Sequence, residues 1–152
     1  MKKSIYVDTR LGTVRISEDG AGICELHFLK EEKGRQEPTP LLEKAKEQLL
    51  EYLKGRRKEF DLPLSMNGTE FQLNVWKQLQ KIPYGETRSY GQVAAMAGNA
   101  KAGRAVGMAN NRNPIAILVP CHRVIGADGS LTGYGGGLDI KQALLELEQG
   151  KL

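Results

Sequence analysis

The first half of the chain alternates short apolar and polar runs before it changes to a helical repeat. Residues 4–7 and 13–16 are rich in β-branched positions, and a third such run extends over about 23–29 after a glycine-containing turn at 18–22. Beyond a polar loop, apolar residues recur at helical spacing at Leu41, Leu42, Ala45, Leu49, Leu50 and Leu53. Gly55 ends this segment. The pattern predicts a small antiparallel sheet with one helix.

The second half is mainly helical in pattern. A capping box at 69–72 begins a helix that ends at the Pro83-Tyr84-Gly85 turn. Its expected inner face consists of Phe71, Val75, Trp76, Leu79 and Ile82. A second capping box at 89–92 begins a short helix that stops at Gly98-Asn99, and another short helix follows over about 101–110. The last helix covers about 138–149, with Ile140, Leu144 and Leu147 as its buried stripe.

Two short helices joined by a glycine-containing turn are the helix-turn-helix pattern. Small residues on the second helix would allow close approach to another backbone, which can be DNA or a neighbouring helix. Residues 65–68 have the composition of a linker. We therefore predict an α/β (α+β) protein with a sheet-and-helix domain at 1–65 and a helical domain at 66–152.

Charge and composition narrow the class of protein. The net charge is +4, and the segment 84–123 holds five basic residues against one acidic residue. Such a segment can contact phosphates or form an ordinary solvated surface. No apolar run has the length of a membrane span or the form of a signal peptide, so we expect a cytoplasmic protein with no membrane partner. The two cysteines, Cys24 and Cys121, are far apart, and we expect both to be free thiols.

The strongest chemical signal follows an apolar run at 115–119, which we interpret as a buried strand. This run leads into Pro120-Cys121-His122-Arg123, where a thiol and an imidazole are adjacent. Thiolate is the reactive form of cysteine, and a neighbouring histidine can assist its formation, here through a bridging water. The alternative is a structural pair, with Cys121 packed as a small hydrophobe. Glu148 lies beside the stripe of the last helix and can either face inward to orient a histidine or remain solvated.

The remaining motifs are less specific. The glycine-rich segment 133–137 lets the backbone approach a flat ligand, although a plain connector has the same composition. It lacks the spacing of a nucleotide-binding loop. Cys24 and His27 are too few for a zinc site, so we expect no metal.

Several ordered motifs resemble those of the O6-alkylguanine-DNA alkyltransferases, which are also called methylated-DNA–protein-cysteine methyltransferases. The motifs are Gly85-Glu86-Thr87, Ser89-Tyr90, Ala97-Gly98-Asn99, Arg104-Ala105-Val106-Gly107, Asn113-Pro114, Pro120-Cys121-His122-Arg123-Val124-Ile125 and Gly133-Tyr134. The resemblance covers nearly all of 66–152 and implies a winged helix-turn-helix domain there. Residues 1–64 match only the general plan of the family's ribonuclease H-like N-terminal domain.

The resemblance also implies roles for single residues. Cys121 would accept the alkyl group, His122 would act as general base through water, Glu148 would polarise His122, and Asn113 would brace the active-site turn. Substrate contacts would come from Tyr90, which donates to the guanine ring, and from Val124 and Gly135, which line the guanine pocket. DNA contacts would come from Arg104, the finger that replaces the flipped base, and from Gly91, Asn99 and Lys101.

The partner implied is double-stranded DNA that contains O6-alkylguanine, with O4-alkylthymine as a further substrate. The base would be extruded from the duplex, and the helix-turn-helix would lie in the minor groove. The product would be a thioether that water cannot cleave, so the protein would act once. No cofactor is needed because the damaged DNA donates the alkyl group. We expect a monomer.

Three positions depart from the family pattern. Gly135 stands where many relatives carry serine, Ala143 where they often have tryptophan, and Leu147 where histidine often precedes the final glutamate. Three other classes of protein remain as alternatives: an alkyltransferase-like lesion binder, which would lack Cys121; a winged-helix regulator, which would not explain the Cys-His pair; and a cysteine hydrolase, which would not explain the helix-turn-helix.

Overall fold

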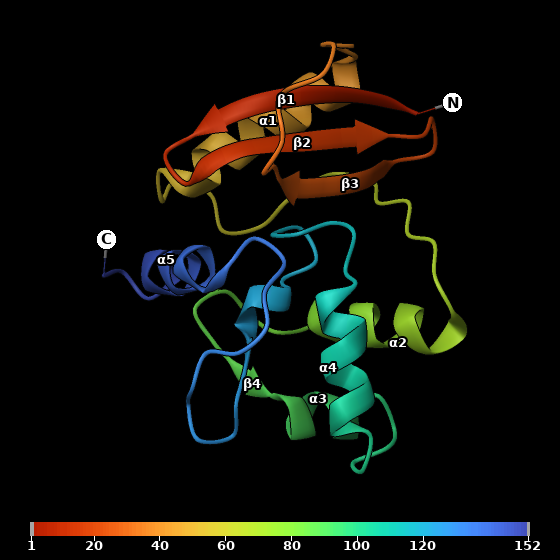
Figure 1. Ribbon diagram of the computed structural model, residues 1–152, viewed down its shortest axis with the longest axis vertical. Coiled ribbons are helices and arrows are strands. Elements are labelled where there is room, and N and C mark those ends of the chain that lie inside the picture. The colour runs from red at the N-terminus through yellow and green to blue at the C-terminus, as the bar shows by residue number, and fades with distance from the viewer. Residues whose placement is uncertain (1, 152) are drawn as a thin grey trace. The chain divides into compact units, whose positions relative to one another are not determined.

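The computed structural model describes residues 2–151, which form two compact units, Met1–Met66 and Asn67–Leu152 (Figure 1). Each unit is described by itself. Within the described residues, no helix is both long and apolar enough to cross a membrane. Cys24 and Cys121 are free thiols, as the sequence predicts.

The first unit is a three-stranded antiparallel sheet with one helix. The strands β1 (Lys3–Thr9), β2 (Gly12–Glu18) and β3 (Ile23–Phe28) lie in the order β1-β2-β3, and α1 (Pro40–Leu53) packs on one face (Figure 1). Apolar residues that alternate along the strands form the core with α1. They are Ile5, Val7, Val14, Ile16 and Leu26, which meet Leu42, Ala45 and Leu49. The predicted sheet and helix are confirmed.

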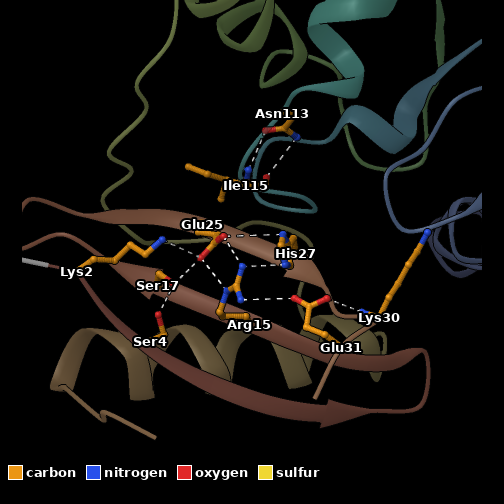
Figure 2. A network of polar contacts seen from close by, with 10 residues as sticks. All are labelled: Lys2, Ser4, Arg15, Ser17, Glu25, His27, Lys30, Glu31, Asn113 and Ile115. Carbon is orange, nitrogen blue, oxygen red and sulfur yellow. Dashed lines mark hydrogen bonds and ion pairs between the residues drawn. The ribbon is translucent and has the colours of Figure 1, made fainter. Parts of the chain in front are cut away.

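The other face of this sheet carries a polar network centred on Glu25 (Figure 2). Arg15 donates two hydrogen bonds to the Glu25 carboxylate, both of 3.0 Å, and Ser17 donates a third of 2.7 Å. Burial alone would raise the pKa of Glu25, but these hydrogen bonds and the positive charge of Arg15 lower it to about 2. The Glu25 carboxylate is therefore ionised over the whole physiological pH range.

The second unit is built from short helices. The helices are α2 (Glu70–Leu79), α3 (Tyr90–Met96), α4 (Gly103–Asn111) and α5 (Leu138–Glu148), with the 3-10 turn η1 (Cys121–Arg123) between α4 and α5. Two short parallel strands, β4 (Arg88–Ser89) and β5 (Val124–Ile125), join the segment before α3 to the segment after η1. Trp76 of α2 is buried and donates a 2.9 Å hydrogen bond from Nε1 to the Ala109 carbonyl of α4.

Both predicted capping boxes are present. The Thr69 hydroxyl accepts from the Gln72 amide while the Gln72 side chain accepts from the Thr69 amide, and Ser89 and Gln92 repeat the arrangement at the start of α3. Each box satisfies two backbone donors that the first turn of a helix leaves unpaired. The helix starts are therefore determined by residues within one turn of them.

Other details of the second unit differ from the predictions. Residues 115–119 form no strand but a sequence of tight turns, although Ile115, Ile117 and Val119 are buried as expected. The helix α2 ends at Leu79, so Ile82 is buried beyond it, and Phe71 is 38% exposed rather than internal. Ile140 is only half-buried, and Lys141 takes a place in the core beside Leu144 and Leu147.

Candidate active site

Two consecutive tight turns deliver Cys121 to the interior of the second unit. Ile117 has φ of +71° and lies between the Ala116 carbonyl and the Leu118 amide, which are 2.8 Å apart, so it occupies the centre of a γ-turn. Pro120, with φ of −79° and ψ of 65°, centres an inverse γ-turn that joins the Cys121 amide to the Val119 carbonyl at 2.7 Å. A β-branched residue with positive φ is strained, which requires the surroundings to hold the turn in place.

The Asn113 side chain holds these turns together. Its Nδ2 donates to the Val119 carbonyl at 2.7 Å and to the Ile115 carbonyl at 3.4 Å, and its Oδ1 accepts from the Ile115 amide at 3.0 Å; Figure 2 includes its contacts with Ile115. The bond to Val119 spans the bend that contains Ile117, and the two contacts with Ile115 hold the backbone just before it. The side chain also forms a hydrogen bond that lowers the pKa of Cys121. Asn113 thus links the shape of the turn to the chemistry of the sulfur.

His122 is fully buried and is oriented by Glu148 of α5. The His122 Nε2 lies 2.7 Å from Glu148 Oε2, and since an ionised carboxylate only accepts, Nε2 carries the hydrogen. The other ring nitrogen, Nδ1, is buried and has no hydrogen-bond partner among residues 2–151. Burial lowers the pKa of His122, although the bond to Glu148 opposes this. The ring is therefore neutral near pH 7 and presents the lone pair of Nδ1.

Arg123 holds the other side of the Glu148 carboxylate. Its Nε and Nη2 donate to the two carboxylate oxygens at 2.8 and 2.9 Å, and its Nη1 donates to the Ile82 carbonyl at 2.7 Å. The Gly85 amide adds a further hydrogen bond of 3.3 Å to Glu148. A buried carboxylate is tolerable when it is paired and hydrogen-bonded in this way. The arrangement fixes Glu148, which in turn fixes His122.

Cys121 itself is 5% exposed, and α5 packs against the 3-10 turn that contains it. Burial raises the pKa of the thiol, while Asn113 and the charge of Lys141 lower it by smaller amounts. The sulfur is therefore protonated at rest near neutral pH and needs a base to react. The Cys121 carbonyl is also engaged, because Asn110 Nδ2 donates to it at 3.3 Å and the Val124 amide donates to it as well.

The glycine-rich segment lies beside Tyr90. The Tyr90 hydroxyl donates to the Thr132 carbonyl at 2.9 Å and accepts from the Thr132 hydroxyl at 3.1 Å. In this arrangement the hydroxyl hydrogen of Tyr90 is engaged with protein, so donation to a guanine ring requires it to leave Thr132. Gly135 is exposed, and a Cβ built on it meets nothing within 4 Å, so the position has room for a serine side chain.

The predicted DNA contacts lie on α3, α4 and the connection between them. Gly98 has φ of +94° and ends α3, and Asn99 then caps the turn by accepting from the Lys101 amide at 3.1 Å. Lys101 and Arg104 are exposed, as is Gly91 near the start of α3. Gly103 of α4 faces α3, and a Cβ built on it would lie 4.0 Å from the Gly91 amide nitrogen, which is an ordinary packing distance. The connection thus exposes one basic side chain, Lys101, and α4 exposes another, Arg104.

Comparison with protein families decides the class. The model described as 6-O-methylguanine DNA methyltransferase, DNA binding domain, matches residues 70–150, and the model of the same methyltransferase's ribonuclease-like domain matches residues 1–66. The chain belongs to the O6-methylguanine DNA methyltransferase family. The predicted resemblance and the predicted α/β fold class are thereby confirmed.

Curated relatives span nearly the whole chain. A methylated-DNA–protein-cysteine methyltransferase of Methanosarcina acetivorans is 51% identical over 147 residues, which cover 93% of this chain and 94% of the relative. The constitutive methylated-DNA–protein-cysteine methyltransferase of Bacillus subtilis is 47% identical over 152 residues, covering 93% and 92%. A crystal structure of Mycobacterium tuberculosis OGT in complex with DNA is 48% identical, with a TM-score of 0.90 over 98% of this chain and 94% of that one.

Cys121, His122, Glu148 and Asn113 were named as site residues from the sequence. Other polar residues that are buried near them were not named. Arg123 was given only as part of the motif around Cys121, and no role was assigned to Lys141. Asn110 was overlooked, although it lies one helical turn from Val106 on the inner face of α4. The Tyr134 hydroxyl is buried without a partner among residues 2–151, and burial raises its pKa well above the ordinary value. Buried polar residues on apolar helical faces were the available signal.

Proposed function

We propose that this protein repairs alkylated DNA by moving the alkyl group of O6-alkylguanine onto the sulfur of Cys121. DNA binding and methyl transfer from O6-methylguanine to a protein cysteine follow from its family and curated relatives. The assignment to Cys121 rests on one observation: the buried thiol is next to His122, whose Nε2 is held by Glu148 at 2.7 Å and whose Nδ1 is free to accept a proton.

The proton of the thiol leaves before or as the sulfur attacks. His122 Nδ1 takes it through a bridging water, because adjacent side chains rarely hydrogen-bond directly. The Glu148 carboxylate stabilises the imidazolium that forms, as a carboxylate does for a histidine base in other enzymes. Since the pKa of the resting thiol is raised, this base is required at neutral pH.

The bond changes balance without a cofactor. The sulfur forms a bond to the alkyl carbon, the bond from that carbon to guanine O6 breaks, and the electron pair stays on the guanine. A ring nitrogen of the guanine gains a proton, which Tyr90 supplies in this proposal after leaving Thr132. The thiol proton that His122 received then returns through solvent to the Tyr90 oxygen, so both groups end neutral. The thioether has no carbonyl that water can attack, so each molecule acts once.

DNA recognition is assigned to α3, α4 and their connection. The duplex is held in its minor groove, the damaged base is extruded, and Arg104 fills the gap that the base leaves. Gly91, Asn99 and Lys101 contact the backbone, while Val124 and Gly135 line the base pocket. O4-alkylthymine is a second substrate, and the protein acts in the cytoplasm as a monomer.

The domain division at residues 65 and 66 belongs to the same proposal. The alkyltransferase site and the DNA-binding helices fall within 66–152. We assign the sheet-and-helix domain at 1–65 a structural role only, with no part in the transfer step or in DNA binding.

Intact mass of the protein after incubation with duplex DNA that carries one O6-methylguanine tests the proposal. We expect one added methyl group per molecule, located on Cys121, and none in Cys121→Ser. The matched control Cys24→Ser removes the other thiol and should be methylated like wild type. Lesion binding without methylation would refute the transfer step, and absence of both binding and methylation would point to the hydrolase alternative.

A further inference from the structure

Lys141 is a buried cation without a counter-anion. Its side chain has 0% exposure in the first part of α5, where Nζ donates to the Thr132 carbonyl at 2.7 Å and to the Gly133 carbonyl at 3.5 Å. It also lies 6.0 Å from the centre of the Tyr90 ring. In the described part of the chain, no carboxylate forms an ion pair with it, whereas the nearby Glu148 is paired with Arg123.

A buried ammonium without an anion is costly, because neutral carbonyls replace only part of its hydration. Burial accordingly lowers the pKa of Lys141 to about 8, yet the group stays mostly protonated near pH 7. The buried ammonium of Lys141 therefore lowers stability, and an anion that is present at some stage of the reaction would offset this cost.

Cys121 is the group that becomes an anion. The helix α5, which carries Lys141, packs against the turn that holds Cys121, and the positive charge of Lys141 lowers the pKa of the Cys121 thiol. Two neighbouring groups do not supply a positive charge at rest. His122, the next residue in the chain, is neutral, and the Tyr134 hydroxyl is uncharged. Arg123 is neutralised by Glu148 behind His122.

We propose that Lys141 is a positioning residue for the transfer step, whose ammonium acts as the counter-ion of the Cys121 thiolate while the thiol proton is on the base. This role rests on the proposed function. The thiolate exists from the loss of its proton to His122 until the carbon–sulfur bond forms, and Lys141 stabilises it in that interval. The lysine itself neither gains nor loses a proton.

The Lys141 ammonium also holds the backbone at Thr132 and Gly133, just before Gly135, the proposed wall of the guanine pocket. The Thr132 carbonyl accepts hydrogen bonds from both Lys141 and Tyr90, so loss of the lysine would disturb the loop as well as the charge. A test must therefore separate charge from shape. Reactivity of the sulfur as a function of pH provides that separation, because the two effects have opposite signs. Loss of the Lys141 charge raises the pKa of the thiol, whereas a displaced loop would reduce the burial of the sulfur and lower its pKa.

The experiment compares Lys141→Met, Lys141→Arg and the matched control Lys77→Met, which removes an exposed lysine from α2 of the same unit. All carry Cys24→Ser so that only Cys121 reacts. The rate of Cys121 modification by iodoacetamide is measured against pH without DNA, and single-turnover methyl transfer is measured with O6-methylguanine duplex DNA.

We expect Lys141→Met to raise the apparent pKa of Cys121 by one unit or more, and thus to slow both reactions at neutral pH by about tenfold or more. Lys141→Arg should keep the wild-type acidity, and Lys77→Met should match wild type in both reactions. Unchanged acidity in Lys141→Met would overturn the proposal, even if transfer were slower.

Two further outcomes remain informative. If Lys141→Met does not fold, the comparison passes to Lys141→Arg, whose charge persists above pH 8: its sulfur reactivity should keep rising there, while that of wild type levels off as Lys141 loses its proton. Identical curves would refute the counter-ion role. If the wild-type chain itself transfers no methyl group, the proposed function fails, and the acidity data still decide the relation between Lys141 and Cys121.

Discussion

Replacing Glu148 with glutamine should weaken the second unit more than any surface change of equal size. The carboxylate accepts hydrogen bonds from His122, from two nitrogens of Arg123 and from the Gly85 amide, at 2.7 to 3.3 Å. An amide has one acceptor oxygen and no charge, so at least two of these four contacts are lost. Arg123, only 8% exposed, would then be a buried cation without an anion.

Breaking a buried ion pair by removing one partner costs about 3–5 kcal/mol, because the remaining charge stays uncompensated. We expect Glu148→Gln to lower the free energy of unfolding by an amount in this range. The measurement is urea denaturation followed by fluorescence of Trp76, the single tryptophan of the chain, which is buried in the same unit. The transition midpoint should fall while its slope stays constant.

The control is Glu146→Gln, which removes the same charge from the same helix at a half-exposed position and should change stability by about 0.5 kcal/mol or less. A second variant, Arg123→Met, completes a double-mutant cycle. The double variant should be less destabilised than the sum of the single variants, since no buried charge remains unpaired. A loss below about 1 kcal/mol in Glu148→Gln would refute the idea that this carboxylate neutralises Arg123.

Three other predictions concern the turn, the sheet and the DNA contact. Asn113→Ala should slow methyl transfer by about tenfold or more and reduce unfolding free energy by about 1–3 kcal/mol, because the Val119 carbonyl loses its donor; rapid-quench kinetics and denaturation test both. Glu25→Gln should alter acid unfolding followed by circular dichroism. Because the pKa of Glu25 is lowered to about 2, wild type gains stability from this carboxylate above pH 4.5 and loses it as the pH falls toward 2. The variant should lack this pH-dependent loss, which is about 1–2 kcal/mol after solvent screening. Arg104→Ala should slow transfer from duplex DNA by about tenfold but leave transfer from free O6-methylguanine base unchanged, and equal slowing of both would contradict a role for Arg104 in base extrusion.

The features that could be predicted from sequence are those whose cause is local. The Thr69 and Ser89 capping boxes each depend on residues within four positions, and both form as expected. The sheet of the first unit likewise follows from alternation and a short turn between β1 and β2. In these segments the preference of the chain and its final environment agree, so tertiary packing had nothing to override.

The segment at 115–119 could not be predicted in the same way. Five apolar residues in a row are compatible with a buried strand, and burial itself was foreseen correctly. The bend at Ile117 instead depends on the Asn113 side chain, which bonds the backbone on both sides of it. Apolar patterning reports that a segment is internal, but it does not report which side chain shapes the backbone.

Lys141 illustrates a second limit. A lysine on an amphipathic helix ordinarily extends its charge to solvent, and its neighbours in sequence gave no reason to expect otherwise. Its acceptors, the carbonyls of Thr132 and Gly133, lie at the start of the glycine-rich segment 133–137. The backbone conformation of that segment cannot be predicted from a hydrophobic pattern. The burial of this lysine therefore emerges only when the loop and α5 are placed together.

The raised pKa of Cys121 has a consistent place in a protein that acts once. A permanently ionised sulfur would react with any alkylating agent that reached it, and each such event would consume a molecule. Burial keeps the sulfur protonated. In the proposed mechanism, His122, which Glu148 orients, provides the base, and Lys141 provides the charge that stabilises the thiolate when a substrate fills the pocket. Under this reasoning, a variant with a more acidic Cys121 should react faster with iodoacetamide and be spent sooner without DNA, so reactivity in the absence of a lesion is the property that the buried site restrains.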